Sequence, residues 1–284
     1  MPRSMILKRK IVLVTGSTDG VGRLVARQLA DQGARVLIHG RNRGRGKELV
    51  EQIRAARGSA VFLPADFSSL NEVRRLADVV PRECDRLDLL INNAGIGSGG
   101  PAGKRETSQD GYELRFAVNY LAGFLLTRLL LPIMMLNKPA RVVNVSSLGQ
   151  HPIDFDDVML TRGYSGQRAY AQSKLAQIMF TFDLAREFNP ATITANCVHP
   201  ATYMATTMVR QSGNTPISTV EEGAEAILNL TVSEKLDGIS GEFYNGLRPS
   251  RANQQAYDAH ARERLRTLSM RLTGLALPQP KNRH

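Results

Sequence analysis

The sequence predicts an α/β fold, namely a doubly wound parallel sheet with helices on both faces. Three observations lead to this prediction. Short runs of aliphatic and β-branched residues recur along the chain, and each is separated from the next by a segment long enough for a crossover helix. A loop with three glycines follows the first run and leads into a good helix-forming segment. No proline- or serine-rich linker interrupts the pattern, so residues 1–284 are expected to form a single domain.

The expected strands define the edge of the sheet where a ligand binds. Because β-α-β crossovers are right-handed, the loops after parallel strands gather at one edge, which is the ligand-binding edge of doubly wound folds. Beyond the last strand, residues 203–219 are expected to form a mobile flap over the substrate, and residues 250–284 a C-terminal helix and tail. The predicted strands are Ile11–Val14, Arg35–His39, Ala60–Leu63, Leu87–Ile91, Arg141–Ser146 and Thr192–Val198.

Composition limits the kinds of partner. The chain is 42% hydrophobic, which is enough for a sizeable core. Its 37 Lys and Arg against 26 Asp and Glu give a formal charge of +11. The excess is dispersed over the N-terminus, residues 41–57 and the C-terminal tail, without a recognition helix or an aromatic stacking platform. A phosphate-rich small ligand or simple solubility explains this charge, and no nucleic-acid partner is expected.

Cysteine usage and the N-terminus predict a cytoplasmic protein. Cys84 and Cys197 cannot form a disulfide framework, which fits a reducing compartment. The first ten residues are basic, but the apolar run Ile11–Val14 is too short for the core of a signal peptide. The most hydrophobic stretch, Leu121–Leu136, contains Arg128 and a proline. We therefore expect a buried helix there and no membrane span.

The glycine loop after the first strand has the properties of a phosphate cradle. Its glycines allow a tight turn and a close approach of the backbone to a pyrophosphate, which the positive end of the following helix stabilises. A plain tight loop is the alternative. The candidate cofactor-binding residues of this loop, which follows Thr15, are Gly16, Ser17, Thr18, Asp19, Gly20, Val21 and Gly22.

Tyr170 and Lys174 form a candidate acid–base pair. They are four residues apart and therefore lie one above the other on a helix face. A cation beside a phenol lowers the phenol pKa from about 10, which makes the group a usable proton donor and acceptor near neutral pH. An isolated pair at this spacing is also common on surface helices. Its combination with the glycine loop is what favours catalysis.

The spacing Gly-x-x-x-Gly-x-Gly after a threonine resembles the short-chain dehydrogenase/reductase family. Asn92-Asn93-Ala94-Gly95, directly after the fourth strand, matches the family's next signature. The resemblance covers about Lys10 to Gly246. The long interval from Gly149 to Arg168, the stretch Tyr170–Ala176 and His199-Pro200 resemble the retinol-dehydrogenase-like branch. The resemblance to the family implies a Rossmann-type oxidoreductase domain that transfers hydride between a nicotinamide and a carbonyl or alcohol.

The resemblance assigns cofactor contacts along the chain. Asp66, after the third strand, matches the residue that accepts a hydrogen bond from the adenine amino group. Asp66 could also cap the helix that begins near Leu70. Asn93, Ala94 and Gly95 match the residues that let the chain pass under the adenosine ribose.

The resemblance also assigns the catalytic residues. The family's motif places the catalytic hydroxyl on Ser147, with Ser146 as the second choice. Ser147 and Tyr170 would stabilise the charge that develops on the carbonyl oxygen, and Tyr170 would donate the proton. Lys174 would lower the Tyr170 pKa and bind the nicotinamide ribose. Asn119 would hold a water beside Lys174 and extend the proton relay to solvent.

Cofactor choice depends on the end of the second strand, His39-Gly40-Arg41. A carboxylate there would favour NAD, but the sequence has none. Arg41, backed by Arg43 and Arg45, offers a geometry that suits the 2′-phosphate of NADP(H). Asp19, inside the glycine loop, argues in the opposite direction. NADP(H) is the prediction, and NAD(H) is the less favoured choice.

The segment after the sixth strand is expected to contact the nicotinamide and the substrate. Relatives carry Pro-Gly and then a threonine that contacts the carboxamide. Here Pro200 is followed by alanine, so the register is open, with Thr206 preferred and Thr202 second. Apolar residues in this segment and in the preceding interval predict a lipophilic ketone, aldehyde or alcohol as the small-molecule substrate.

Several alternatives remain at this point. A catalytically silent dinucleotide sensor or scaffold on the same fold would normally lose the tyrosine or the lysine, and this chain keeps both. A lyase or epimerase on this scaffold is a minor possibility. His151 is expected to line the substrate loop and not to act as an acid. No metal site is expected, and a homo-oligomer is left open.

Overall fold

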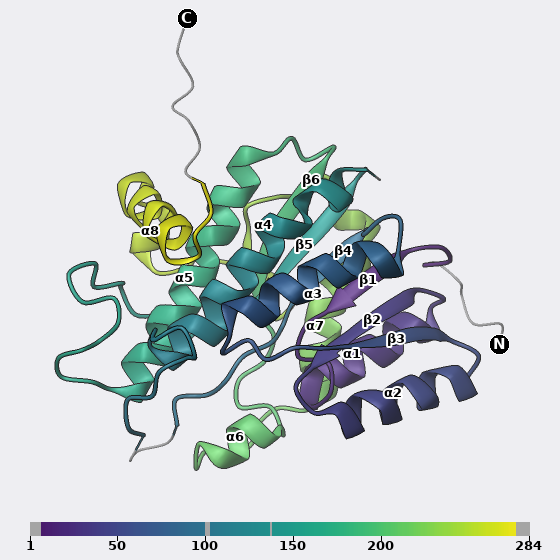
Figure 1. Ribbon diagram of the computed structural model, residues 1–284, viewed down its shortest axis with the longest axis horizontal. Coiled ribbons are helices and arrows are strands. Elements are labelled where there is room, and N and C mark those ends of the chain that lie inside the picture. The colour runs from purple at the N-terminus through teal and green to yellow at the C-terminus, as the bar shows by residue number, and fades with distance from the viewer. Residues whose placement is uncertain (1–6, 100–102, 137, 277–284) are drawn as a thin grey trace, which may run out of the picture.

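One sheet of eight strands runs through the molecule, with helices on both of its faces (Figure 1). A computed structural model describes residues 7–99, 103–136 and 138–276. The strands are β1 (Ile11–Val14), β2 (Arg35–Gly40), β3 (Ser59–Pro64), β4 (Leu89–Asn92), β5 (Ala140–Val145), β6 (Ile193–His199), β7 (Phe243–Asn245) and β8 (Arg248–Ser250). Their order in the sheet is β3-β2-β1-β4-β5-β6-β7-β8, and only the β7–β8 pair is antiparallel.

The helices form two layers. The helical elements are α1 (Gly20–Asp31), α2 (Arg43–Ala55), α3 (Leu70–Glu83), the π-helix η1 (Phe116–Leu121), α4 (Ala122–Met135), α5 (Gly166–Glu187), α6 (Thr207–Gln211), α7 (Val220–Val232), the 3₁₀ turns η2 (Glu234–Leu236) and η3 (Gln254–Tyr257), and α8 (Ala259–Leu272). One hydrophobic core lies between the sheet and α3, α4 and α5, with Leu125 and Ile178 at its centre. A second core lies between the sheet and α1, α2 and α7, around Leu29, Leu49 and Ile227.

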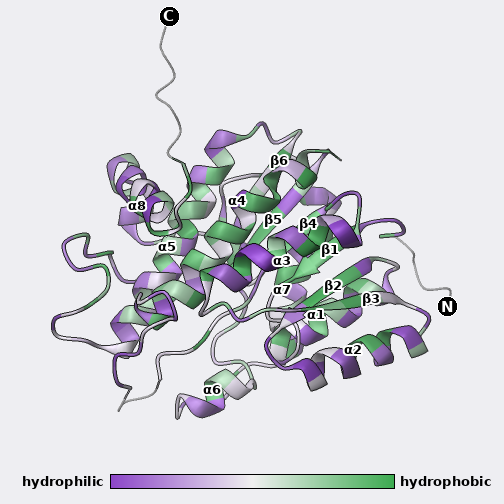
Figure 2. Ribbon diagram, viewed as in Figure 1, coloured by the Kyte–Doolittle hydropathy of each residue, from purple (hydrophilic) through white to green (hydrophobic). Residues whose placement is uncertain are grey.

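The central strands β1 and β4 are buried along their whole length. Every residue of β1 and β4 is buried, and Figure 2 shows these strands as hydrophobic. Continuous burial, without alternation, is what a parallel strand covered on both faces requires. The doubly wound α/β prediction is therefore confirmed.

The strand boundaries differ from the prediction at chemically specific points. β4 begins at Leu89 and not at Leu87, because the buried carboxylate of Asp88 accepts the N–H of Ile11 at 2.9 Å. β5 ends at Val145, so Ser146 lies just beyond the strand. The sequence pattern missed β7 and β8, because strands of three residues are too short to show a periodicity.

The buried helix predicted over Leu121–Leu136 belongs to a longer helical segment, which is not a uniform α-helix. Its first part, Phe116–Leu121, is a π-helix, and the α-helix begins at Ala122. Together they form a 20-residue helix that is long and apolar enough to cross a membrane, but 78% of its most apolar window is buried inside the fold. The predicted buried helix is present. At the C-terminus, α8 falls within the predicted segment 250–284, whose residues 277–284 lie outside the described part of the chain.

Candidate active site

The carboxyl ends of β1, β4, β5 and β6 meet at one edge of the sheet. β1 lies between β2 and β4. From β1 the chain adds β2 and β3 on one side of it, and then crosses over to add β4, β5 and β6 on the other side. A reversal of this kind opens a crevice in doubly wound sheets. The glycine loop, Asn93, Ser147 and Pro200 follow these four strands and are therefore brought to the same edge.

The glycine loop is locked against the loop that follows β4. Gly16 has a φ of 64°, and a Cβ on it would lie 2.7 Å from the Cα of Ala94. The Asn93 side chain donates to the carbonyl oxygens of Thr15 and Gly16 at 2.9 and 3.1 Å. A side chain on Gly22 would collide with Asn93 and with the Gly16 carbonyl. Only glycine permits this packing, which holds the first turn of α1 directly behind the loop.

Histidine 39 joins three parts of this edge. Its Nδ1 accepts the N–H of Gly16 at 3.1 Å, and its Nε2 lies 3.2 Å from the carbonyl oxygen of Ala65. These two partners require the neutral tautomer with the proton on Nε2. Its ring stacks on Phe67 at 4.2 Å between centroids, and burial lowers its pKa to about 4. From the sequence, His39 was notable only because no carboxylate stands at the end of the second strand. Its hydrogen-bonding role was not predicted.

Two further residues of the loop have structural partners. The buried hydroxyl of Ser17 donates to the carbonyl oxygen of Val14 at 2.7 Å, and the N–H of His39 donates to that hydroxyl at 3.0 Å. Thr18 packs against Gly40 so closely that a Cβ on the glycine would lie 2.6 Å from the threonine hydroxyl. The end of β2, and with it the start of the arginine segment, is therefore held beside the glycine loop.

The adenosine side of the edge carries exposed charges. Arg41 is exposed, and within the described ranges no hydrogen bond or ion pair holds its guanidinium. Asp66 does not cap the following helix, which corrects one of its two predicted roles. α3 has Ser69 at its N-cap position, and the N–H of Leu70 donates to Asp110 at 2.9 Å. Asp66 instead accepts the N–H of Ser68 at 2.9 Å and shapes the turn.

Asn119 is held in the π-helix by three hydrogen bonds. Its Oδ1 accepts the N–H of Ile96 at 2.7 Å, and its Nδ2 donates to the Ile96 carbonyl and to the Ser173 hydroxyl at 3.1 and 3.0 Å. A Cβ on Gly95 would lie 3.2 Å from Asn119 Oδ1 and 3.6 Å from Lys174 Nζ. π-Helical turns occur frequently at functional sites. Here the turn clamps the loop after β4 beside Lys174.

The structure distinguishes the two serines after β5. The Ser146 hydroxyl donates to the carbonyl oxygen of Lys174 at 2.8 Å, deep inside the fold. The Ser147 hydroxyl accepts the N–H of Gly149 at 3.0 Å, and it lies beside the Tyr170 ring, since a Cβ on Gly149 would be 3.4 Å from Ser147 Oγ and 3.8 Å from Tyr170 Cε1. Ser147, the preferred choice, is therefore the serine that meets Tyr170.

Lys174 is buried beneath Tyr170. Its Nζ donates to the carbonyl oxygen of Val145 and to the Gln177 side chain, both at 2.9 Å, and lies 5.8 Å from the centre of the Tyr170 ring. Burial lowers the Lys174 pKa to about 7. Gln177 is a partner that sequence reasoning missed, although its spacing of three residues on the same helix is a detectable signal.

The expectation that Lys174 lowers the Tyr170 pKa is wrong for this structure. Burial raises the Tyr170 pKa above its usual value of 10, and only the hydrogen bond from Ser147 opposes that rise. The physical reason is that both groups leave water, and desolvation penalises the phenolate and the ammonium alike. His199 behaves in the same way, since burial and then the neighbouring Lys174 charge lower its pKa to about 4.

The flap contains α6 and returns to the fold through a bridge between Met204 and Ser218. Thr206 caps α6 by accepting the N–H of Val209 at 3.4 Å, and its methyl group faces Gly20. The hydroxyl of Thr202 is hydrogen-bonded to Nε2 of His199 at 3.0 Å. Of the two threonines considered for the nicotinamide contact, Thr206 is thus the one beside the glycine loop.

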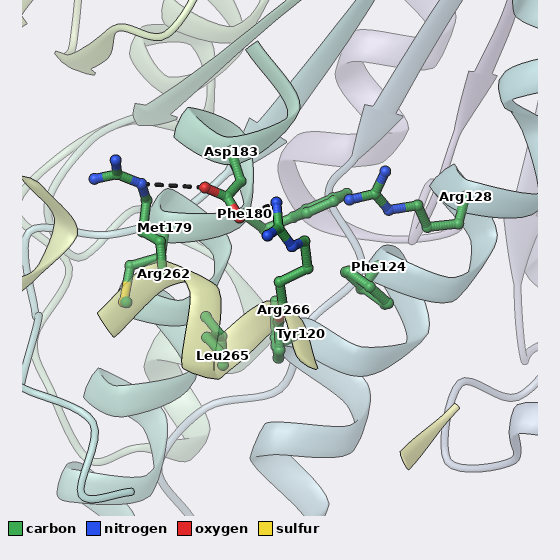
Figure 3. Close-up of a pocket in the computed structure, with 9 residues that line it drawn as sticks. All are labelled: Tyr120, Phe124, Arg128, Met179, Phe180, Asp183, Arg262, Leu265 and Arg266. Atoms are coloured by element: carbon green, nitrogen blue, oxygen red, sulfur yellow. Dashed lines mark hydrogen bonds and ion pairs between the residues drawn. The ribbon is translucent and has the colours of Figure 1, made fainter. Parts of the chain in front are cut away.

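A small cavity on the other side of α5 does not belong to this edge (Figure 3). Its volume is about 10 Å³, which is close to the space of one water molecule. Asp183 of α5 accepts from Arg262 of α8 at 3.2 Å. The cavity marks the packing of α8 against α4 and α5 and is too small for an organic substrate. It is lined by Tyr120, Phe124, Arg128, Met179, Phe180, Asp183, Arg262, Leu265 and Arg266.

Retinol dehydrogenases resemble this chain over nearly its whole length. Retinol dehydrogenase 13 of Mus musculus is 33% identical, with 97% of this chain and 87% of the relative covered. Retinol dehydrogenase 12 of Homo sapiens is 34% identical, with 95% and 88% covered.

Solved structures share the fold. An uncharacterized protein from Mycobacterium paratuberculosis has a TM-score of 0.79 and 29% identity, and 96% of each chain is covered. The Pseudomonas aeruginosa RhlG/NADP active-site complex has a TM-score of 0.71 and 28% identity, with 86% of this chain and 97% of that chain covered. The family model for short chain dehydrogenases matches residues 10–216. The chain therefore belongs to the short-chain dehydrogenase family and is an oxidoreductase of that family.

Proposed function

We propose that this protein is an NADP(H)-dependent oxidoreductase that transfers hydride between the nicotinamide and a lipophilic ketone, aldehyde or alcohol, with Tyr170 as the general acid and base. The observation that carries the proposal is the grouping of Ser147, Tyr170 and Lys174: a Cβ on Gly149 would touch both Ser147 Oγ and the Tyr170 ring, and the buried Lys174 Nζ lies 5.8 Å from that ring. These groups lie at the sheet edge that also carries the glycine cradle.

The residues present fit a dinucleotide. The backbone at Gly16 and Gly22 leaves no room for side chains, and the N–H groups in the first turn of α1 have no partner within the helix. These groups would hold the pyrophosphate. Arg41 would bind the 2′-phosphate, and Thr206 would contact the carboxamide. When bound, the nicotinamide supplies or accepts the hydride.

In reduction of a carbonyl, Tyr170 would be the proton donor. The phenol stays protonated at neutral pH, which is the form that donates a proton to the carbonyl oxygen. Ser147 would donate a second hydrogen bond to that oxygen and stabilise its developing charge. Lys174 has three N–H donors, of which Val145 and Gln177 use two, so one remains for a ribose hydroxyl.

Exposed apolar groups beside the site support a lipophilic substrate. Leu148, next to Ser147, is 44% exposed, and Tyr203, at the start of the flap, is 47% exposed. Met208 of α6 packs against Gly97 of the loop after β4. Single exposed apolar side chains are common, but apolar groups that gather beside a site mark a contact surface for another molecule. The relatives named as retinol dehydrogenases agree with a lipophilic alcohol or aldehyde.

A screen of hydrophobic aldehydes and ketones with NADPH, followed by the loss of nicotinamide absorbance, tests the proposal. We expect turnover with at least one medium-chain or ring-containing carbonyl compound and little turnover with small polar ones. Binding of NADPH without turnover of any substrate, alcohols with NADP included, would favour the silent dinucleotide sensor instead. A protein that binds neither cofactor would contradict the proposal altogether.

A further inference from the structure

One carboxylate on the glycine loop is shared by three elements. Asp19 accepts the N–H of Gly20 through Oδ1 at 2.8 Å and so caps α1. Its Oδ2 accepts from Arg45 Nη1 of α2 at 3.0 Å and from the hydroxyl of Thr207, the first residue of α6, at 2.9 Å. The side chain therefore links the cofactor loop to the arginine segment on one side and to the flap on the other.

These two outer contacts are not part of a packed core. The side chains of Asp19 and Arg45 are 47% and 53% exposed, and Thr207 is exposed as well. An exposed ion pair contributes little to folding stability. The contacts of Asp19 instead influence which positions the side chains of Arg45 and Thr207 occupy. Both partners lie beside the proposed cofactor site.

The ion pair divides the arginines that follow β2 into two classes. Arg41 has no partner within the described ranges and is free to meet an anion. Arg45 is only four residues further, and the Asn42 side chain holds its backbone N–H at 3.0 Å, but its guanidinium is paired with Asp19. A 2′-phosphate that recruits Arg45 must first take it from this carboxylate.

We propose that Asp19 determines cofactor specificity by holding Arg45 back from the 2′-phosphate, and that the same carboxylate ties the substrate flap to the cofactor loop. The inference rests on the proposed function, because it assumes that a dinucleotide lies on the glycine loop. It predicts that the preference of the natural protein for NADPH over NADH is smaller than its arginines would give. It also predicts that Asp19 has two contacts that can be removed separately. We call them the phosphate arm, which is its pair with Arg45, and the flap arm, which is its hydrogen bond with Thr207.

Two substitutions separate the arms. Asp19→Asn keeps the helix cap, because asparagine caps as well as aspartate, and its Nδ2 still reaches the Thr207 hydroxyl as a donor. It removes the attraction for Arg45. Thr207→Val removes the flap contact and leaves the Asp19–Arg45 pair intact. Circular dichroism and thermal unfolding of both variants check that the fold is kept.

Dissociation constants for NADPH and NADH, measured by nicotinamide fluorescence, test the phosphate arm. Asp19→Asn should bind NADPH about two- to fivefold more tightly, the size expected when an exposed pair is released, and NADH with little change. Arg45→Gln should abolish that gain in the double variant. An unchanged ratio in Asp19→Asn, alongside a loss of NADPH affinity in Arg41→Asp, would overturn the inference and leave the proposed function standing.

Limited trypsin cleavage after Arg210 in α6, on the protein without cofactor, tests the flap arm. Thr207→Val should be cleaved several-fold faster than the natural protein, and Asp19→Asn at an unchanged rate. Equal rates in Thr207→Val and the natural protein would show that Asp19 does not restrain the flap. Failure of the natural protein to bind either cofactor would overturn the phosphate arm together with the proposed function.

Discussion

The two ends of the proposed site differ in how their residues are held. At the chemical end, Lys174 and Asn119 are almost fully buried. Asn119 accepts a backbone N–H and Lys174 donates to a backbone carbonyl oxygen, so both side chains are fixed. At the end proposed for adenosine and the flap, Arg41, Asp19 and Thr207 are exposed. Asp19 contacts Gly20, Arg45 and Thr207, whereas Arg41 has no side-chain partner among the described residues. Under the proposed function, reactivity would therefore be set by buried, hydrogen-bonded groups and specificity by exposed ones.

The largest expected effect comes from Tyr170 at the chemical end. Tyr170→Phe removes the proposed proton donor and keeps the ring, so turnover should fall by about 10²-fold or more, while NADPH affinity should hardly change. Steady-state rates and cofactor titration measure both quantities. Tyr257→Phe, at an exposed tyrosine away from the sheet edge, is the control. Retention of most activity in Tyr170→Phe would refute the mechanism.

Lys174→Met should lower turnover and weaken cofactor binding together, because one side chain packs beside the Tyr170 ring at 5.8 Å and also supplies the spare donor that would position a ribose hydroxyl. We expect each quantity to change by at least tenfold. The same rate and binding measurements on Lys235→Met, at an exposed lysine, give the control. If binding alone weakened, Lys174 would be a cofactor ligand without a role in proton transfer.

Arg41→Asp should have a smaller effect that is confined to cofactor choice. It removes the proposed phosphate partner and supplies an acceptor for a 2′-hydroxyl, so NADPH affinity should fall about ten- to a hundredfold and NADH affinity should rise. High salt should reduce the effect on NADPH. Dissociation constants for both cofactors decide the matter, and Arg27→Asp, at an exposed arginine in the second half of α1, should leave them nearly unchanged. A natural protein that already prefers NADH would contradict the role of Arg41.

Sequence reasoning performed differently at the two ends. The strands around the site were predictable, because glycine loops and apolar runs have strong local signals, whereas the assignment of Ser147 and Tyr170 to one site came from the resemblance to the family. The raised Tyr170 pKa was not predictable, since desolvation depends on the packing of distant segments. The three-way contact of Asp19 was equally hidden, because Thr207 lies 188 positions away in the chain.

His39 provides a test that concerns folding stability and not cofactor binding or turnover. Its ring joins the N–H of Gly16 to the carbonyl oxygen of Ala65. Its pKa is about 4 in the fold and 6.5 in a free side chain, so between these values the unfolded chain binds a proton that the folded protein does not. The resulting stability is fully present above pH 6.5 and is lost as the pH falls toward 4. One group with this shift accounts for about 3 kcal/mol at most.

His39→Gln offers the same acceptor and donor without titrating, so it should be within about 1–2 kcal/mol of the natural protein at pH 7. Its free energy of unfolding should depend less on pH between 6.5 and 4. Urea unfolding of both proteins across this range gives the comparison, and His151→Gln, at an exposed histidine, should keep the natural pH dependence. His199, whose pKa is also about 4, contributes equally to both proteins and cancels in the difference. If the two curves ran parallel, the folded His39 would titrate as the unfolded one does, and the link between the glycine loop and Ala65 would not depend on the neutral ring.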